Sequence, residues 1–563
     1  MIRSIVGVEK LIYRNICVSV SRKKHLWSSD NVVRSSFEDV DIPNLSVHEY
    51  MWKDLAKWSN KTAVVCGLTN RQYTYEQIYR QSQALGARLR KSFQVKDGDT
   101  VAIMLPNIPE YPVTVLGVQA AGGVVSTLNP VYTAHELQRQ LQISNPKAIF
   151  VINETAGVVK EALKLIKRNI PIIAINLNNE LPADTIRYTE LVDTNIDLSV
   201  LKEVRYDVNE VAFLHYSSGT TGLPKGVELT HRNVVANSEQ QNTELKLFED
   251  TTESNQDVAL AILPMFHSYG LNIVMFHKLS VGLKLVTLPR FEPETMVNVM
   301  TNHKFDLLYL APPLVLFLGS YPQITSKHFE RLRCVVSGAA PLPQADLDRL
   351  LGKAVKNDVH FSQGYGLTEV GPLATLNPIG YKNYKSVGLA LPNIELRIVD
   401  GNLNNLGPNE VGELLIKGPN VMKGYKNNPE ANKDVFVEGS WLRSGDLGSI
   451  DETGSVYILD RLKELIKVSG FQVPPAELES ELKLHPGVFD AAVIGVKDPK
   501  SGERPKAFVV LNEGFKTSDE EIMKFVNERV APYKKIKELV FLESIPKNAS
   551  GKILRRMLVQ KFT

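Results

Sequence analysis

At 563 residues the chain is several times the usual size of a domain, so we expect two or more domains with sizeable cores. The 65 Lys and Arg residues against 62 Asp and Glu residues give a net charge of +3. Together with the lack of a basic block interleaved with aromatic residues, this balance argues against a nucleic-acid-binding protein. The three cysteines, Cys17, Cys66 and Cys334, are far apart and lack metal-ligand spacing, which favours a reducing compartment.

The first 30 residues differ in composition from the rest of the chain. They are rich in serine and carry six basic residues against two acidic ones. Their apolar residues could share one face of a helix: Ile5, Val8, Leu11 and Ile12. This composition is typical of a mitochondrial transit peptide, with a disordered basic tail as the alternative. We therefore expect a mitochondrial protein, with the cytoplasm or the peroxisome as alternatives, although Lys561–Thr563 is not the S-K-L peroxisomal signal.

Buried strands and helices alternate through the first half of the chain. Residues 101–127, 147–176 and 258–288 each read as an apolar strand, a helix and a second strand. This pattern predicts parallel α/β layers, and the similarity of the first and third units suggests two related subdomains. Residues 111–134 carry no charge, but proline and glycine interrupt them, so we expect a buried helix and strand there and no integral membrane segment.

The stretch YSSGTTGLPKGVELT, residues 216–230, follows a short apolar run and combines glycine, hydroxyl groups and a lysine. Glycine allows backbone N–H groups to turn toward a ligand, and a series of such groups forms an anion-binding nest. We expect this loop to bind a triphosphate, although its spacing is not that of the ordinary P-loop. The residues that would contact phosphate are Ser217, Ser218, Gly219, Thr220, Thr221 and Lys225.

The pattern changes in the last third of the chain. Residues 393–459 alternate between apolar and polar positions with Gly and Asn between them, which predicts an antiparallel β subdomain. We place a hinge at 460–463 and a small, mobile α+β domain at 464–563, after a large domain at 31–459. In the small domain, Ser518 and Glu521 predict a capping box for a helix that runs through Val530.

Several motifs occur in one order along the chain: SSGTTGLPKGV, SGAAPL (337–342), QGYGLTEVGP (363–372), SGDLG (444–448) and PKNASGKILRR. This series resembles the AMP-forming adenylating superfamily of acyl-CoA synthetases, 4-coumarate–CoA ligases and firefly luciferases. The resemblance extends from Phe37 to Leu558, and it implies a two-domain enzyme with ATP, Mg²⁺ and CoA as cofactors.

The resemblance assigns nucleotide and metal contacts to particular positions. Thr221 and Glu369 would hold Mg²⁺, and Asp446 would accept hydrogen bonds from the ribose hydroxyls. Besides the phosphate loop, the positions implied for the nucleotide are Gly338, Ala339, Ala340, Gln363, Gly364, Tyr365, Gly366, Thr368, Asp446, Arg461 and Lys463.

Two lysines of the small domain would serve different half-reactions. By resemblance, Lys552 bridges the attacking carboxylate and the α-phosphate, whereas Lys467 takes part in thioester formation. Further positions implied for CoA are Arg290, Gly470 and Gln472.

The motif PMFHSYGLN places His267 and Tyr269 beside the acyl group and the thiol, where a histidine could act as a gate or as an acid or base. Gly338 and Val336 would also face the acyl group. Plant 4-coumarate ligases usually carry a lysine where this chain has Val336, so we expect a more apolar pocket here.

We therefore predict an acyl-CoA synthetase that converts ATP and a fatty or aromatic acid to an acyl-adenylate and then to a thioester. The alternatives are a 4-coumarate–CoA ligase proper, a luciferase-like oxygenase, an enzyme that loads a carrier-protein thiol, and an inactive nucleotide-binding scaffold. The partner is a small-molecule carboxylic acid, and the sequence leaves the oligomeric state open.

Overall fold

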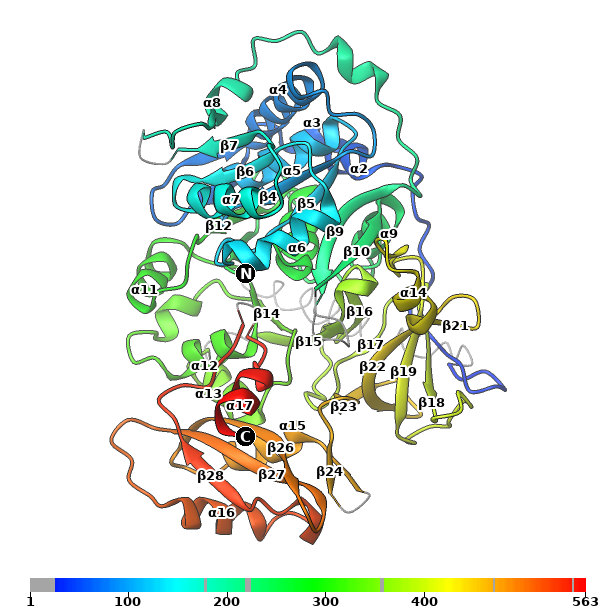
Figure 1. Cartoon of the computed structure of the whole chain (residues 1–563), viewed down its shortest axis with the longest axis vertical. Coiled ribbons are helices and arrows are strands. Elements are labelled where there is room, and N and C mark those ends of the chain that lie inside the picture. The colour runs from blue at the N-terminus through cyan, green and yellow to red at the C-terminus, as the bar shows by residue number, and fades with distance from the viewer. Residues whose placement is uncertain (1–25, 177–179, 218–223, 355–358, 469–470, 549–550) are drawn as a thin grey trace, which may run out of the picture.

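The computed structural model describes residues 26–176, 180–217, 224–354, 359–468, 471–548 and 551–563. Figure 1 shows two α/β layers in the upper and middle parts of the molecule, a β subdomain beside them, and the C-terminal residues below. The predicted fold class, a large α/β domain with a β subdomain and a small α+β domain, is confirmed. Residues 1–25, 218–223 and 469–470, which include most of the expected transit peptide and the tip of the phosphate loop, lie outside the described residues.

The first α/β layer is an eight-stranded sheet in the order β20-β10-β9-β5-β4-β6-β7-β8, with parallel pairing from β9 to β8. Its central strands are buried on both faces, as their apolar runs predict. Its strands are β4 (Thr100–Met104), β5 (Val124–Thr127), β6 (Ile149–Ile152), β7 (Ile172–Ile175), β8 (Ile186–Arg187), β9 (Val211–Ser217), β10 (Lys225–Thr230) and β20 (Gly424–Tyr425).

The second layer is a nine-stranded sheet in the order β17-β16-β15-β14-β13-β11-β12-β2-β3, parallel from β15 to β2. The two related subdomains expected from the sequence correspond to these two largely parallel sheets. The strands of the second sheet are β2 (Thr62–Cys66), β3 (Gln72–Thr74), β11 (Val258–Ala261), β12 (Lys284–Thr287), β13 (Leu307–Leu310), β14 (Cys334–Ser337), β15 (His360–Gly366), β16 (Leu373–Leu376) and β17 (Leu389–Ala390).

Helices cover these sheets, and every residue of α5 is buried. This confirms the predicted buried helix and strand at 111–134, and none of the helices in the described ranges is long and apolar enough to cross a membrane. The helices of the large domain are α2 (Val47–Trp52), α3 (Leu55–Trp58), α4 (Tyr75–Phe93), α5 (Glu110–Ala120), α6 (Ala134–Ser144), α7 (Asn153–Leu165), α8 (Tyr188–Leu191), α9 (His231–Glu239), the π-helix η3 (Tyr269–His277), α10 (Lys278–Ser280), α11 (Pro293–Asn302), α12 (Pro312–Ser320), α13 (Gln344–Lys353) and α14 (Pro429–Val435). Short 3₁₀ turns are η2 (Ser199–Glu203), η4 (Ser326–Phe329) and η5 (Thr368–Val370).

The β subdomain is a six-stranded sheet whose pairs are all antiparallel, as predicted for 393–459. One strand comes from near the N-terminus, which the sequence pattern did not predict. The strands are β1 (Val33–Arg34), β18 (Glu395–Val399), β19 (Gly412–Lys417), β21 (Phe436–Val437), β22 (Trp441–Ile450) and β23 (Val456–Arg461).

The C-terminal residues form a five-stranded sheet with helices against it. The last strand of the β subdomain ends at Arg461 and the first of this sheet begins at Ile466, so the chain crosses from one to the other next to the proposed hinge. The elements are β24 (Ile466–Val468), β25 (Phe471–Val473), α15 (Pro475–Lys483), β26 (Val488–Asp498), β27 (Gly502–Leu511), α16 (Asp519–Asn527), η6 (Pro532–Lys534), β28 (Glu538–Phe541) and α17 (Arg555–Phe562).

The predicted capping box of α16 is wrong in part. The Ser518 hydroxyl accepts from the Glu521 N–H at 3.2 Å as expected, but the Glu521 carboxylate accepts from the Thr517 hydroxyl at 2.8 Å. The helix also ends at Asn527 rather than at Val530, because the Asn527 side chain exchanges two hydrogen bonds with the backbone of Ile536. A contact with the loop nine residues further along the chain thus overrides the local helical pattern.

The C-terminal domain is docked on the large domain by a nearly buried ion pair. Lys483 of α15 lies 3.1 Å from Asp346 of α13 and 3.2 Å from Asp490. Gly551 packs against Pro313 at the start of α12, where a Cβ on the glycine would lie 2.7 Å from the proline ring. These contacts bring the loop before α17 next to the start of α12, directly after β13 of the second sheet.

Candidate active site

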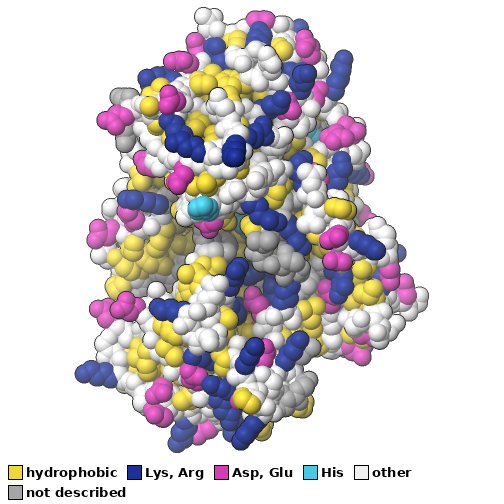
Figure 2. All heavy atoms as spheres, viewed as in Figure 1, with side chains coloured by type: hydrophobic (Ala, Val, Ile, Leu, Met, Phe, Trp, Pro, Cys, Tyr) yellow, Lys and Arg dark blue, Asp and Glu magenta, His cyan; other side chains and the backbone are white. Residues whose placement is uncertain are grey.

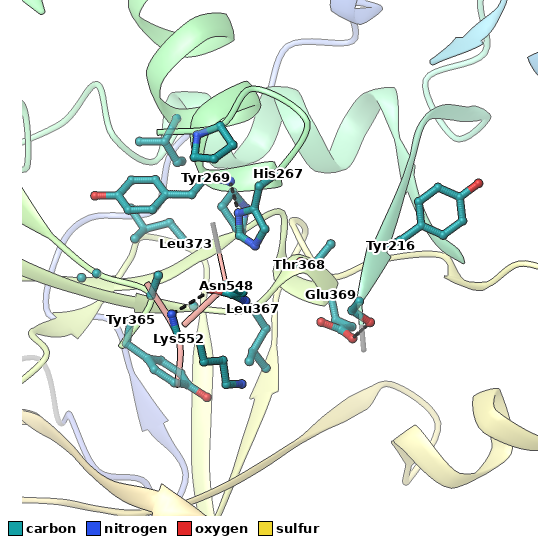
Figure 3. Close-up of a pocket in the computed structure, with 18 of the residues that line it drawn as sticks. Tyr216, His267, Tyr269, Tyr365, Leu367, Thr368, Glu369, Leu373, Asn548 and Lys552 are labelled. Atoms are coloured by element: carbon teal, nitrogen blue, oxygen red, sulfur yellow. Dashed lines mark hydrogen bonds between the residues drawn. The ribbon is translucent and has the colours of Figure 1, made fainter. Parts of the chain in front are cut away.

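A cavity of about 880 Å³ lies between the two α/β layers, the β subdomain and the C-terminal loop. Figure 2 shows a hollow in the middle of this face, bordered by Lys and Arg side chains. Figure 3 shows residues from distant parts of the sequence around it: Tyr216, His267, Tyr269, Tyr365, Leu367, Thr368, Glu369, Leu373, Asn548 and Lys552.

Glu369 presents a carboxylate to this cavity from the short turn η5, and the residue is 8% exposed. Its Oε1 accepts from the Ser217 hydroxyl at 2.6 Å and from the Tyr425 hydroxyl at 2.9 Å. Both hydroxyls donate to the same oxygen, so these contacts fix the orientation of the carboxylate, and neither of them involves Oε2.

Asp446 lies behind the cavity wall, 3% exposed, on β22. Its Oδ2 accepts from the Tyr365 hydroxyl at 2.6 Å, and its Oδ1 lies 3.0 Å from Nε of Arg461 on the adjacent strand β23. Burial raises the pKa of Asp446, and the Arg461 guanidinium opposes that shift. The carboxylate can still accept further hydrogen bonds, since each oxygen has a second lone pair.

Four cationic side chains stand close enough to influence one another. Burial and then Arg461 lower the pKa of Lys552, and burial, Arg461 and Lys225 lower the pKa of Lys463. The ammonium of Lys225 also lies 4.8 Å from the ring of Tyr425, a cavity residue. Arg461, Lys463 and Lys552 line the cavity, and such a group of mutually repelling cations indicates a site for a highly charged anion such as a triphosphate.

Lys552 reaches the cavity from the loop before α17. Asn548 holds this loop, because its Oδ1 accepts from the Lys552 N–H at 2.8 Å and its N–H donates to the Lys552 carbonyl at 2.9 Å. Figure 3 shows the Lys552 side chain beside Tyr365, with His267 across the cavity. The arrangement brings a C-terminal cation to the large domain's candidate nucleotide residues.

His267 is held as a neutral hydrogen-bond donor. Burial lowers its pKa to about 4, and its Nδ1 accepts from the Tyr269 N–H at 3.2 Å. The proton of the neutral ring therefore resides on Nε2. This form suits a donor to a carboxylate or phosphate oxygen better than a base.

Two of the motifs, SGAAPL and QGYGLTEVGP, approach each other closely at Gly338. A Cβ on Gly338 would lie 3.0 Å from the Gly364 carbonyl, so a larger residue would push these backbones apart. Next to it, Ala339 adopts a φ of 76°, a left-handed conformation unusual for alanine. The close approach forms a thin wall suited to a flat ring such as a nucleobase.

The cavity is less apolar than Val336 alone suggested. Val336 and Tyr269 line it as predicted, and the Tyr269 ring lies against Gly338. However, the same cavity is also lined by Lys278 and Tyr309, which the sequence analysis did not single out. A lysine inside the apolar run LNIVMFHKLS was the one signal that could have revealed this.

Comparison with known proteins matches residues 51–426 to the model of the AMP-binding enzyme family and residues 477–552 to that of the AMP-binding enzyme C-terminal domain. The chain belongs to the AMP-binding enzyme family. It is 38% identical to "4-coumarate--CoA ligase 2" of Petroselinum crispum over 544 residues, which cover 95% of this chain and 97% of the relative. Like this relative, it is an acid–thiol ligase of the AMP-forming type, whose substrates are ATP, a carboxylic acid and a thiol.

Solved structures agree with this assignment. ATP-bound MatB from Rhodopseudomonas palustris is 27% identical, with a TM-score of 0.81 and coverage of 92% of this chain and 99% of the other. A benzoate CoA ligase from Burkholderia xenovorans LB400 is 26% identical, with a TM-score of 0.80 and coverage of 91% and 99%.

Most of the site residues implied by the family motifs come together. Those that line the cavity are Ser217, His267, Tyr269, Val336, Gly338, Ala339, Gly364, Tyr365, Gly366, Thr368, Glu369, Arg461, Lys463 and Lys552. Those among the described residues that do not line it are Lys225, Arg290, Ala340, Gln363, Asp446 and Lys467. Those outside the described residues are Ser218, Gly219, Thr220, Thr221 and Gly470, and the Gln472 side chain is not described either.

Three of the residues that do not line the cavity have other contacts or are exposed. The Gln363 amide is used structurally, because it donates to the Tyr384 carbonyl. Arg290 is exposed and paired with Glu292 at 2.7 Å. Lys467 is exposed on β24, and its N–H donates to the Glu503 carboxylate at 2.7 Å. The expected roles of Arg290 and Lys467 in CoA binding remain predictions.

Replacing Lys467 by alanine should slow CoA transfer from a supplied acyl-adenylate by about 10- to 100-fold, the cost of one hydrogen bond to a charged group. Adenylate formation should be nearly unchanged, because the side chain is exposed and does not line the cavity. Single-turnover assays of each half-reaction measure this, with Lys497→Ala as an exposed-lysine control on β26. Equal CoA transfer in the Lys467 variant and the wild type would remove this segment from the second step.

Proposed function

We propose that the chain joins an aromatic carboxylic acid to CoA through an acyl-adenylate made from ATP. The observation that carries the proposal is the convergence of Lys552, His267, Glu369 and Arg461 on one cavity, although they lie far apart in sequence. The names of the Petroselinum crispum and Burkholderia xenovorans relatives refer to aromatic acids, which supports an aromatic acyl group. The expectation that fatty acids are also substrates stays a prediction.

In the first half-reaction, a carboxylate oxygen of the acid attacks the α-phosphorus of ATP, and the bond to pyrophosphate breaks. The Lys552 ammonium would stabilise the charge that the α-phosphate oxygens and the entering carboxylate share. Arg461 and Lys463 would face the phosphates, and the Nε2–H of His267 would donate to an oxygen of the acid. Asp446 would orient the ribose through its remaining lone pairs.

The residues fit a magnesium ion as a phosphate-bound cofactor. No cluster of three or more His, Cys, Asp or Glu side chains suited to a metal occurs among the described residues. Mg²⁺ is commonly held by one or two carboxylates together with substrate phosphates and water, so Glu369 alone suffices with ATP present. The ion would neutralise phosphate charge there, and Thr221 would be its second protein contact.

In the second half-reaction, the CoA thiolate attacks the acyl carbon and AMP leaves. Lys552 lines the cavity and Lys467 does not, so this arrangement of the small domain presents only Lys552. We propose that residues after the hinge at 460–463 rotate between the two steps, which breaks the ion pair between Lys483 and Asp346.

A panel of carboxylic acids tests the proposed function. Purified protein with ATP, Mg²⁺, CoA and each acid should release AMP and form thioester with benzoates or cinnamates. Fatty acids turned over at least about tenfold faster than every aromatic acid would refute the aromatic assignment. Adenylate without thioester would instead favour a carrier-protein thiol, and light emission a luciferase-like oxygenase.

We further propose that residues 1 to 30 direct the protein to mitochondria, because of their basic, serine-rich composition. Fusing them to a fluorescent protein should give a mitochondrial signal in cells, and removing residues 1–25 should leave catalysis intact. A diffuse cytosolic signal from the fusion would contradict the proposal.

A further inference from the structure

Lys278 is a buried lysine at the wall of the cavity. The residue is 2% exposed and begins the short helix α10, directly after the π-helix η3. Its ammonium nitrogen lies 2.8 Å from Nδ1 of His277, which also lies 3.1 Å from Oε1 of Gln241, and the other ring nitrogen, Nε2, lies 2.8 Å from the side-chain oxygen of Asn242. The ammonium also lies 5.1 Å from the ring centre of Phe248 and 5.0 Å from that of Tyr309, distances typical of a cation over aromatic faces.

No anion compensates this lysine within the described residues. No carboxylate there is among the charged groups that act on it, and the one hydrogen-bond contact of its ammonium in these residues is with His277. Cys334 is nearby, but burial raises its pKa to about 12, so the thiol is neutral. Burial also lowers the pKa of Lys278 to about 7, which is the expected result of an uncompensated cation.

A second polar group at the same place also lacks a partner. The Tyr309 residue is 2% exposed, and its hydroxyl meets no hydrogen-bond partner among the described residues. Buried hydroxyls are nearly always hydrogen-bonded, so this unpartnered hydroxyl, on a residue that lines the cavity, is available as a donor to a ligand. Lys278 and Tyr309 both line the cavity, and together they offer donors to one acceptor group.

The pair lies beyond the acyl-lining residues, away from the reacting carboxylate. Tyr309 on β13 is the direct neighbour of Val336 on β14, which in turn lies next to Tyr269. Lys278 follows Tyr269 by nine residues, at the other end of the π-helix η3. The same cavity is also lined by the apolar residues Leu245, Leu247 and Ile273 and by the polar residue Gln241.

We propose that the cavity accepts acids that carry a second carboxylate at the end remote from the activated one, with Lys278 as its counter-ion and the Tyr309 hydroxyl as a further donor. The inference rests on the proposed function and specifies its substrate class. The second carboxylate supplies the anion that the buried ammonium lacks, and its two oxygens match the two donor groups. A neutral phenol would bond only one donor well and would leave the charge uncompensated.

The test compares matched pairs of acids that differ only at the remote end. We would measure kcat/KM for cinnamate, 4-carboxycinnamate and 4-hydroxycinnamate, and for medium-chain monocarboxylic and dicarboxylic acids. The variants are Lys278→Met, which keeps the length of the side chain, and Tyr309→Phe, which keeps the ring. Lys246→Met is the matched control, because that lysine also lies 5.1 Å from Phe248 but is paired with Asp250.

For at least one pair, the wild type should prefer the diacid by about 10²-fold or more, as in sites built to bind a polar substrate group. Lys278→Met should reverse this preference while retaining or increasing activity on the monocarboxylic acid. Tyr309→Phe should reduce the preference by about three- to tenfold, the cost of one hydrogen bond. Lys246→Met should match the wild type, and melting curves should show that each variant is folded.

Other outcomes overturn the inference. Ligation of monocarboxylic acids with no Lys278-dependent preference for diacids would refute it and leave the proposed function intact. A Lys278-dependent preference for 4-hydroxycinnamate over 4-carboxycinnamate would assign the subsite to a phenol instead. If Lys278→Met does not fold, equal kcat/KM for diacid and monoacid in the wild type and in Tyr309→Phe decides against the inference. Thioester formation from none of these acids would refute the proposed function as well.

Discussion

Replacing Lys552 by alanine should slow acyl-adenylate formation by about 10²–10³-fold, as the loss of a charge aimed at a transition state typically does. The side chain lies in the cavity with Glu369, His267 and Arg461. Its neighbour Lys547, for comparison, is paired with Asp490 at 2.5 Å. The measurement is the single-turnover rate of pyrophosphate release with a saturating acid.

The same variant should convert supplied acyl-adenylate and CoA to thioester at nearly the wild-type rate. Each half-reaction would use its own arrangement of the small domain, and Lys552 would leave the cavity before CoA reacts. Lys561→Ala, an exposed lysine on α17, provides the control. Equal loss of both half-reactions in Lys552→Ala would contradict the proposed rotation.

Replacing Glu369 by glutamine should reduce adenylate formation by about 10²-fold and raise the Mg²⁺ concentration needed for half-maximal rate. The substitution isolates the charge, because the hydrogen bonds from Ser217 and Tyr425 both end on Oε1, which a glutamine carbonyl can replace. Because these hydrogen bonds are kept, the variant should have the same melting temperature as the wild type.

Tyr425→Phe serves as the comparison for Glu369→Gln. It removes one donor to the carboxylate but keeps the charge, so adenylation should fall only by about three- to tenfold. A Glu369→Gln variant with the same Mg²⁺ requirement as the wild type would mean that another group holds the ion.

The large-scale fold could be predicted because its signals are local. The apolar runs that form β4, β6 and β11, and the uncharged stretch around α5, have no other stable place than a buried parallel sheet. The family motifs then indicated which loops meet at one cavity, and the family and the ligase type are confirmed by the comparisons. The transit peptide, the compartment and the roles of individual residues stay predictions.

What the sequence could not predict depends on contacts between distant residues. Val336 indicated an apolar pocket, but the lining also depends on Lys278 and Tyr309, which come from other elements. Neither belongs to a motif, and whether a lysine is buried without a counter-ion follows only from the three-dimensional packing. The predicted end of α16 was wrong because the Asn527 side chain forms hydrogen bonds with the backbone of Ile536, which the helical pattern does not show.

The most direct test of the account is acid-dependent exchange of labelled pyrophosphate into ATP in the absence of CoA. An enzyme that forms an acyl-adenylate reversibly before CoA reacts catalyses this exchange. It should occur with the wild type, fall by about 10²–10³-fold with Lys552→Ala and persist with Lys467→Ala. Addition of CoA should then yield AMP and thioester in equal amounts. Exchange that requires CoA, or thioester formed with release of ADP and phosphate, would contradict the account.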